Sequence, residues 1–125
     1  VSSCGWTLMN YYNGGKLGPW AQELYMPLIR DKYNLDPDKV PFDFDEVIAA
    51  LAPRPFFSNS PLKDSNFDVE GVKKGIASAL EVYKFFNAKD KLHVCYPDAG
   101  HEFPPDVVLQ AYQFIDKVLE HSAVE

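Results

Sequence analysis

The sequence predicts an α/β fold in which helices cover both faces of a parallel β-sheet. Three short apolar runs have the composition of strands, and each ends near glycine or proline. Amphipathic segments of helical period separate or follow these runs. Helices that alternate with short apolar strands are typical of a parallel sheet buried on both faces. The 125 residues fit a single domain that spans the whole chain, residues 1–125.

The first strand is expected over residues 1–5, at the start of the chain. Residues 6–20 are rich in Gly, Asn, Tyr and Trp, a composition typical of a loop. Its aromatic side chains, Trp6, Tyr11, Tyr12 and Trp20, either pack beneath the loop or line a cleft, and packing is the favoured interpretation. A short helix broken by Pro27 is expected over residues 21–31.

The middle of the chain predicts a helix and then a strand. Residues 42–51 form the helix, with Asp43 as its N-cap and Glu46 in the matching position of a capping box. Prolines end this helix, and residues 55–60 have strand composition. A polar loop follows over residues 62–68.

The last third of the chain predicts two long helices on either side of a strand. Apolar residues recur every three and four positions over residues 69–86, which predicts a helix. The third strand is expected over residues 91–96. Pro105 then opens a final helix with one apolar face, and residues 122–125 form a tail.

Composition excludes several classes of partner. The net charge is −6, from twelve basic and eighteen acidic residues, and the basic residues do not cluster. This balance argues against binding to nucleic acid or to an anionic membrane surface. No apolar run approaches the roughly 20 residues that a membrane span requires. The two cysteines, Cys4 and Cys95, lie in predicted strands and are expected to be free thiols.

Chemistry-bearing side chains follow two of the predicted strands. Asp64 and Asp68 lie in the loop after the second strand, and His101 lies in the loop after the third, on a turn that contains Gly100. The carboxyl ends of parallel strands meet at one edge of the sheet, where neighbouring strands are about 4.8 Å apart. A carboxylate that faces a histidine across this gap is the acid–base half of a nucleophilic triad.

Simpler interpretations of these residues remain open. An aspartate at a strand end is more often a turn or cap residue than a catalytic one. Asp98, His101 and Glu102 form a possible metal cluster, but their spacing matches no strong ligand motif. His93 and His121 are most simply structural or solvent-exposed.

The two loops resemble those of the α/β-hydrolase family. Residues 98–105, Asp-Ala-Gly-His-Glu-Phe-Pro-Pro, resemble its histidine loop, and residues 62–67, Leu-Lys-Asp-Ser-Asn-Phe, resemble its acid loop. The front of the chain is similar to bacterial esterase-like members: acetyl-xylan-esterase-like, dienelactone-hydrolase-like or prolyl-oligopeptidase-like. The resemblance implies a serine hydrolase of carboxylic esters in which Asp64 is the triad acid and His101 the base, with Asp68 as the alternative acid. It also implies a partial α/β-hydrolase fold, whose three strands are the sixth to eighth of the family.

One part of the family pattern does not occur in the chain. The nucleophile elbow requires Gly-x-Ser-x-Gly, which none of the 125 residues provides. We therefore expect residues 1–125 to be the C-terminal portion of the domain, with the nucleophile and oxyanion hole before Val1, and the isolated chain to be inactive.

Partners and alternatives follow from the same interpretation. The expected partners are a small-molecule or carbohydrate-linked ester substrate, and either the missing N-terminal half or a second copy of the chain. No cofactor or metal is expected. The alternatives are a non-catalytic binding or interaction module that retains the half-fold, and an α/β domain of another class.

Overall fold

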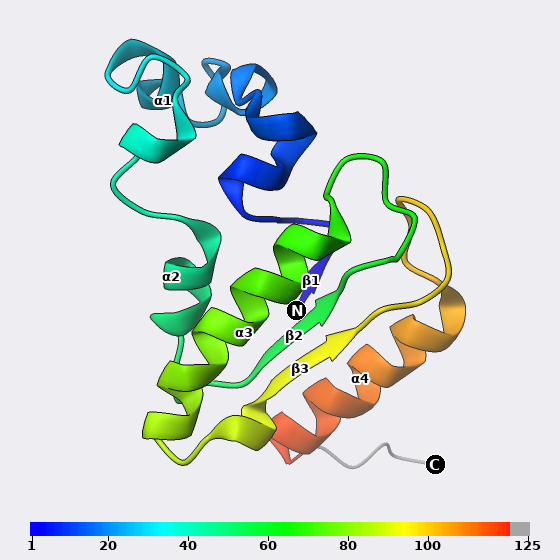
Figure 1. Ribbon diagram of the computed structural model, residues 1–125. Helices are drawn as coiled ribbons and strands as arrows, with labels where there is room; N and C mark the ends of the chain where they lie inside the picture. Colours follow the sequence, from blue (N-terminus) through cyan, green and yellow to red (C-terminus); the bar gives the residue numbers. More distant parts are fainter. Residues whose placement is uncertain (121–125) are drawn as a thin grey trace.

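The computed structural model describes residues 1–120, which form a three-stranded parallel sheet (Figure 1). The strands are β1 (Ser2–Ser3), β2 (Phe56–Asn59) and β3 (Leu92–Cys95), in the spatial order β1-β2-β3. Ser58 pairs with Ser2 on one side and with Val94 on the other. The predicted α/β fold with three parallel strands is therefore confirmed. β1 is shorter than predicted because the chain turns at Cys4, whose φ is +48°.

Helices cover both faces of the sheet, as predicted. α3 (Val69–Phe85) lies on one face and α4 (Pro105–Leu119) on the other (Figure 1). Phe57 of β2 is fully buried against Val107 and Ala111 of α4. Its neighbour Phe56 packs in the cluster on the α3 side instead. This alternation is the period of two that a strand buried on both faces requires.

The core on the α3 face is the larger of the two clusters beside the sheet. It combines residues from the chain after β1, from α2, from α3 and from the segment before β3: Trp6, Ile48, Val72, Ala79, Tyr83 and Ala88. Ser58 is buried in the same region and accepts a hydrogen bond from Nε1 of Trp6, at 3.1 Å. The strand that separates Cys4 from Cys95 is β2, and both thiols are free.

Helix α2 (Phe44–Ala49) begins with the predicted capping box. The Asp43 carboxylate accepts from the Phe44 amide at 2.6 Å, and Glu46 accepts from the Asp43 amide at 2.9 Å. The same Asp43 carboxylate accepts from the amide of Met9, at 3.0 and 3.1 Å to its two oxygens. One side chain thus starts the helix and ties the front segment to it.

The front segment contains more structure than a loop, and of the helix predicted over residues 21–31 only the part after Pro27, Leu28–Asp31, forms an α-helix. Two 3₁₀ helices, η1 (Met9–Gly15) and η2 (Gly18–Ala21), come first. Between η2 and residue 31, only α1 (Leu28–Asp31) is helical. The Met26 amide bonds the Trp20 carbonyl at 3.0 Å and closes a loop, which leaves Pro27 to begin a helix and not to interrupt one.

Two further 3₁₀ turns complete the chain, η3 (Pro37–Lys39) and η4 (Lys89–Lys91). None of the helices in residues 1–120 is long and apolar enough to cross a membrane. His121 and the predicted tail, residues 122–125, lie outside the described residues.

Candidate active site

The loops after β2 and β3 run together beyond the sheet. The amides of Ser60, Leu62 and Lys63 donate to the carbonyls of Cys95, Pro97 and Ala99, at 2.9, 2.9 and 3.0 Å. These bonds extend the pairing of the two strands into their loops. They bring the segment that carries Asp64 against the segment that carries His101.

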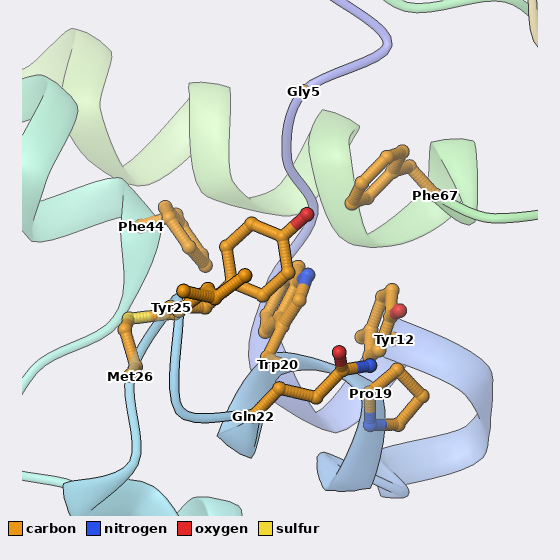
Figure 2. Close-up of a pocket in the computed structure, with 10 residues that line it drawn as sticks. Gly5, Tyr12, Pro19, Trp20, Gln22, Tyr25, Met26, Phe44 and Phe67 are labelled. Carbon is orange, nitrogen blue, oxygen red and sulfur yellow. The ribbon is translucent and has the colours of Figure 1, made fainter.

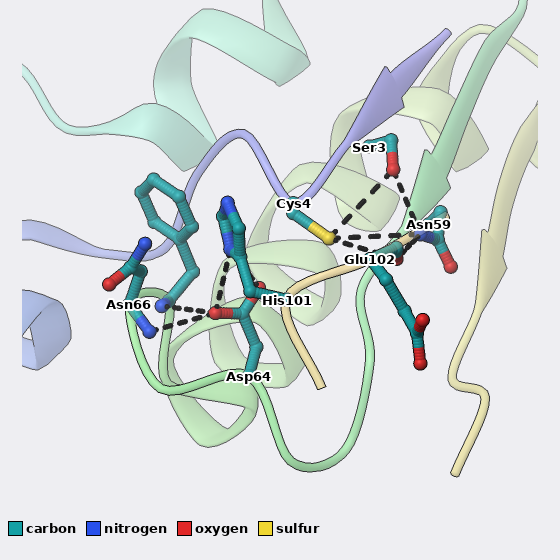
Figure 3. A network of polar contacts seen from close by, with 8 residues as sticks. Ser3, Cys4, Asn59, Asp64, Asn66, His101 and Glu102 are labelled. Atoms are coloured by element: carbon teal, nitrogen blue, oxygen red, sulfur yellow. Dashed lines mark hydrogen bonds and ion pairs between the residues drawn. The ribbon is translucent and has the colours of Figure 1, made fainter. Parts of the chain in front are cut away.

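Asp64 and His101 form a hydrogen-bonded pair at the carboxyl ends of the strands (Figure 3). Nδ1 of His101 lies 3.0 Å from Oδ1 and 3.1 Å from Oδ2 of Asp64. The Asp64 side chain is 1% exposed, whereas the His101 side chain is 43% exposed. An ionised carboxylate only accepts hydrogen bonds, so Nδ1 carries the proton and Nε2 of the neutral ring is left as an acceptor.

The backbone of its own loop fixes the Asp64 carboxylate. Oδ1 accepts from the amides of Asn66 at 2.8 Å and Phe67 at 3.1 Å. This arrangement is an Asx-turn, in which an aspartate side chain accepts hydrogen bonds from the backbone amides that follow it. The Phe67 ring lies 5.9 Å from the His101 ring, at an interplanar angle of 28°. Both partners are thus held by neighbours that are themselves part of the acid loop.

The alternative acid, Asp68, has a different position. Its side chain accepts from the Glu70 amide at 2.8 Å and caps the N-terminus of α3. Its carbonyl accepts from the Thr7 hydroxyl at 2.8 Å. The structure therefore brings Asp64, and not Asp68, to His101.

The side chains of the possible metal cluster do not gather around His101. Asp98 pairs with Lys63 at 2.6 Å, and both side chains are 69% exposed. Glu102 contributes its backbone carbonyl to this region. In residues 1–120 the potential metal ligands that converge are Cys4, Asp64 and His101, with one donor atom of each within 4.8 Å of the others.

Cys4 also lies in this region, although the sequence alone predicts no catalytic or binding role for it. Its thiol donates to the Glu102 carbonyl at 3.2 Å (Figure 3). Burial, and secondarily the nearby Asp64 carboxylate, raise the pKa of this thiol. The same rule that selected Asp64 and His101 applies to Cys4, because it directly follows β1 at the same edge of the sheet.

Asn59, at the end of β2, links the three strand ends. Its Nδ2 donates to the Ser3 hydroxyl and to the Glu102 carbonyl, both at 2.9 Å. The side chain is fully buried. It ties β1 to the histidine loop, a role that no sequence motif indicates.

An aromatic cavity of about 730 Å³ lies beside the acid loop, on the front segment (Figure 2). Its wall includes Tyr12 and Trp20, stacked with ring centroids 4.0 Å apart, and Phe67, which also touches His101. The two other front aromatics pack elsewhere: Trp6 is 4% exposed, and the Tyr11 hydroxyl bonds Lys74. Tyr12 and Trp20 therefore line a cleft and also pack against the buried cluster of the front segment, whereas Trp6 and Tyr11 do not line the cleft.

No serine among residues 1–120 hydrogen-bonds to His101. Ser58 and Ser60 are buried, and their hydroxyls bond each other at 3.0 Å. The Ser3 hydroxyl accepts from Asn59. The described site thus contains a positioned acid and base and lacks a paired nucleophile.

Comparison with known proteins identifies two similar solved structures. A carbohydrate esterase family 15 (CE15) glucuronoyl esterase from Caldicellulosiruptor kristjansonii aligns over 96% of this chain with a TM-score of 0.77 and 23% identity. This chain spans 36% of that protein. Methylesterase BT1017 aligns over 61% of this chain and 17% of its own, with a TM-score of 0.52 and 27% identity. No protein-family model and no curated protein matches the chain. The likeness shows the fold, a part of the α/β-hydrolase type found in esterases.

Proposed function

We propose that this chain is part of a serine hydrolase of carboxylic esters, acetyl-xylan-esterase-like in type, and that it supplies the triad acid Asp64 and the triad base His101. The observation that carries the proposal is the buried Asp64 carboxylate at 3.0 Å from Nδ1 of a half-exposed histidine. The esterase fold of the two similar structures supports it.

The geometry suits the two tasks of a triad. Asp64 holds the proton on Nδ1, so Nε2 accepts a proton from a serine hydroxyl while Oγ attacks the ester carbonyl. The buried carboxylate stabilises the imidazolium that results, since charges interact more strongly away from water. Nε2 then returns the proton to the leaving alcohol oxygen as the carbon–oxygen ester bond breaks. A water molecule repeats the sequence and releases the acid and the serine.

In this proposal, the serine nucleophile belongs to a segment that is not among these 125 residues. The absence of Gly-x-Ser-x-Gly supports it, as does the share of the glucuronoyl esterase that the chain spans, 36%. The isolated chain is then inactive, because a triad without its nucleophile keeps only weak residual catalysis. Serine-dependent turnover of a p-nitrophenyl ester by the 125-residue chain would refute this part.

The proposed substrate is a small-molecule or carbohydrate-linked ester. The aromatic cavity supports a ring-bearing substrate, because Tyr12 and Trp20 line it together with Phe67, whose ring lies 5.9 Å from the His101 ring. The names of the two similar structures, a glucuronoyl esterase and a methylesterase, support ester chemistry.

A fluorophosphonate probe, which labels activated serines, tests the function. We expect a longer polypeptide that carries the proposed nucleophile segment to be labelled, and labelling to be lost in His101→Ala. His93→Ala is the matched control, because His93 lies in β3 against Phe57 and away from Asp64. An unlabelled polypeptide with an intact Gly-x-Ser-x-Gly would favour the alternative, a non-catalytic binding module.

A further inference from the structure

Three different metal-binding groups lie close together at the sheet edge, on Cys4, Asp64 and His101. Each follows a different strand: Cys4 follows β1, Asp64 lies in the loop after β2 and His101 in the loop after β3. One donor atom of each lies within 4.8 Å of the others. A thiolate, a carboxylate and an imidazole are the ligands that zinc takes in proteins.

The spacing is close to that of a zinc site. Bonds of about 2.3 Å to sulfur and about 2.0–2.2 Å to nitrogen and oxygen, at tetrahedral angles, separate the donor atoms by about 3.3–3.6 Å. The nitrogen and oxygens of His101 and Asp64 are already 3.0 and 3.1 Å apart. Because the donor atoms of all three residues lie within 4.8 Å of one another, the cysteine sulfur has to approach the other two donors by about 1.5 Å at most.

The three donors are free to change partners. Oδ1 of Asp64 is occupied by two backbone amides, but Oδ2 accepts within residues 1–120 from His101 alone. The Cys4 thiol gives up the hydrogen bond that it donates to the Glu102 carbonyl at 3.2 Å, while its sulfur also accepts two longer ones, each at 3.8 Å, from the Ser3 hydroxyl and from Nδ2 of Asn59. The exposed fraction of His101, 43%, leaves an approach from solvent. Zinc sites with three protein ligands leave the fourth position to water or a substrate.

We propose that Cys4, Asp64 and His101 bind a zinc-like cation that switches off the acid–base pair. Binding releases the thiol proton to solvent. A cation on Nδ1 displaces the proton to Nε2, and a cation on Nε2 occupies that atom directly, so in both cases the histidine no longer accepts a proton. The binding stands on the geometry alone; its inhibitory consequence rests on the proposed function.

Cobalt(II) is the probe, because it occupies zinc sites and a thiolate ligand gives it a charge-transfer absorption band. We expect the 125-residue chain to bind one equivalent and to show this band. Zinc should abolish the band by displacement, and magnesium, which prefers oxygen ligands, should not. A chain that shows no band under cobalt excess would overturn the proposal.

The second thiol gives a matched control. Cys95 lies 3.8 Å from Nε2 of His93, so it is the competing thiol–histidine pair. We expect Cys4→Ser and His101→Ala to lose the band and Cys95→Ser to keep it. A band that persists in Cys4→Ser, or disappears only in Cys95→Ser, would assign the metal to the other pair and contradict the proposal.

One measurement needs no variant and therefore does not depend on the fold of one. Saturating zinc should slow iodoacetamide alkylation of Cys4 in the unaltered chain by about tenfold or more, because a metal-bound sulfur is shielded, and leave Cys95 unchanged. Equal rates with and without zinc would overturn the proposal. Because neither readout uses ester hydrolysis, failure here is distinct from failure of serine labelling.

Discussion

Asp64 and Asp68 lie in one loop, and the backbone around each gives it a different task. The Asp64 carboxylate is buried and bonds His101, whereas Asp68 caps α3 from an exposed position. Both are aspartates of the same loop. The difference therefore arises from the backbone amides that each carboxylate bonds: those of Asn66 and Phe67 for Asp64, and that of Glu70 for Asp68.

The pair Asp64→Asn and Asp68→Asn separates these tasks in a catalytically complete polypeptide. Asp64→Asn should lower kcat by about 10⁴-fold, because an amide no longer holds the proton on Nδ1. Asp68→Asn keeps a good cap residue, so both kcat and stability should stay close to those of the unaltered protein. Steady-state hydrolysis of an ester measures both. A larger loss of kcat in Asp68→Asn would show that the acid assignment is wrong.

The meeting of Asp64 and His101 could be predicted from the sequence, because the ends of parallel strands converge. The same rule does not select Cys4 from the sequence, because the predicted first strand, residues 1–5, places the cysteine inside it, whereas β1 ends at Ser3. Gly100, in the histidine turn, has a φ outside the left-handed region, and a Cβ there would meet nothing within 4 Å, so the turn does not require glycine.

Tyr83 makes a pH-dependent contribution to stability. It is fully buried, its hydroxyl donates to the Arg54 carbonyl at 2.9 Å, and burial raises the pKa of its phenol. A group whose pKa is raised on folding stabilises below its unfolded pKa, about 10, and loses this contribution as the pH rises through the folded value. Ionised Tyr83 is the destabilising form.

We therefore expect the free energy of unfolding to fall, as the pH rises above about 10, more steeply in the unaltered chain than in Tyr83→Phe. Urea unfolding at several pH values measures the two slopes. Tyr83→Phe should be less stable at neutral pH, by about 1 kcal/mol, because it lacks one hydrogen bond. Equal slopes for both proteins would rule out this role.

At the scale of elements, two glycines let α3 pack closely on the chain after β1. A Cβ on Gly71 would lie 2.5 Å from the Cβ of Tyr11 and still closer to the Thr7 hydroxyl, and a Cβ on Gly75 would lie 2.8 Å from the Trp6 ring. The Cβ of Tyr11 is fixed to its backbone, so side-chain rotation does not relieve the first overlap. The helix or the front segment would have to shift.

Gly71→Ala should destabilise the chain by about 1–3 kcal/mol through this overlap, partly offset by a gain of about 1 kcal/mol in helix propensity. Gly18→Ala is the control, because a Cβ there meets nothing within 4 Å. Chemical denaturation of both variants provides the comparison. A Gly71→Ala chain as stable as the unaltered one would mean that the front segment is not packed against α3 in this way.

The long elements could be predicted from periodicity and caps, and the short ones could not. Regular apolar spacing gives α3 and α4, and the Asp43–Glu46 capping box gives the start of α2. The turns between residues 9 and 31 depend on contacts such as the stacking of Tyr12 on Trp20, which no local pattern encodes. Pro27, which the sequence pattern predicts to break a helix, is instead the N-cap of a four-residue helix.

At the scale of the whole molecule, the sheet and several helices leave apolar surface uncovered. Within residues 1–120, β1 pairs only with β2. Leu24 is 93% exposed and Phe85 is 81% exposed. An unpaired strand edge and bare apolar side chains favour association.

We expect the 125-residue chain to associate with itself or with a chain that supplies the neighbouring strand. Sedimentation velocity over a range of concentrations should show a weight-average mass that rises with concentration. Addition of a chain that supplies the neighbouring strand should replace self-association by a defined complex. A monomer that stays monodisperse at high concentration would count against this expectation.

The proposed function requires that Asp64 holds His101 as a base with its acceptor at Nε2. The ¹⁵N chemical shifts of the His101 ring, measured in the unaltered chain at a pH where the imidazole is neutral, test it most directly. We predict that Nδ1 carries the proton, and that Asp64→Asn abolishes this preference. A neutral His101 with its proton on Nε2 would contradict the account.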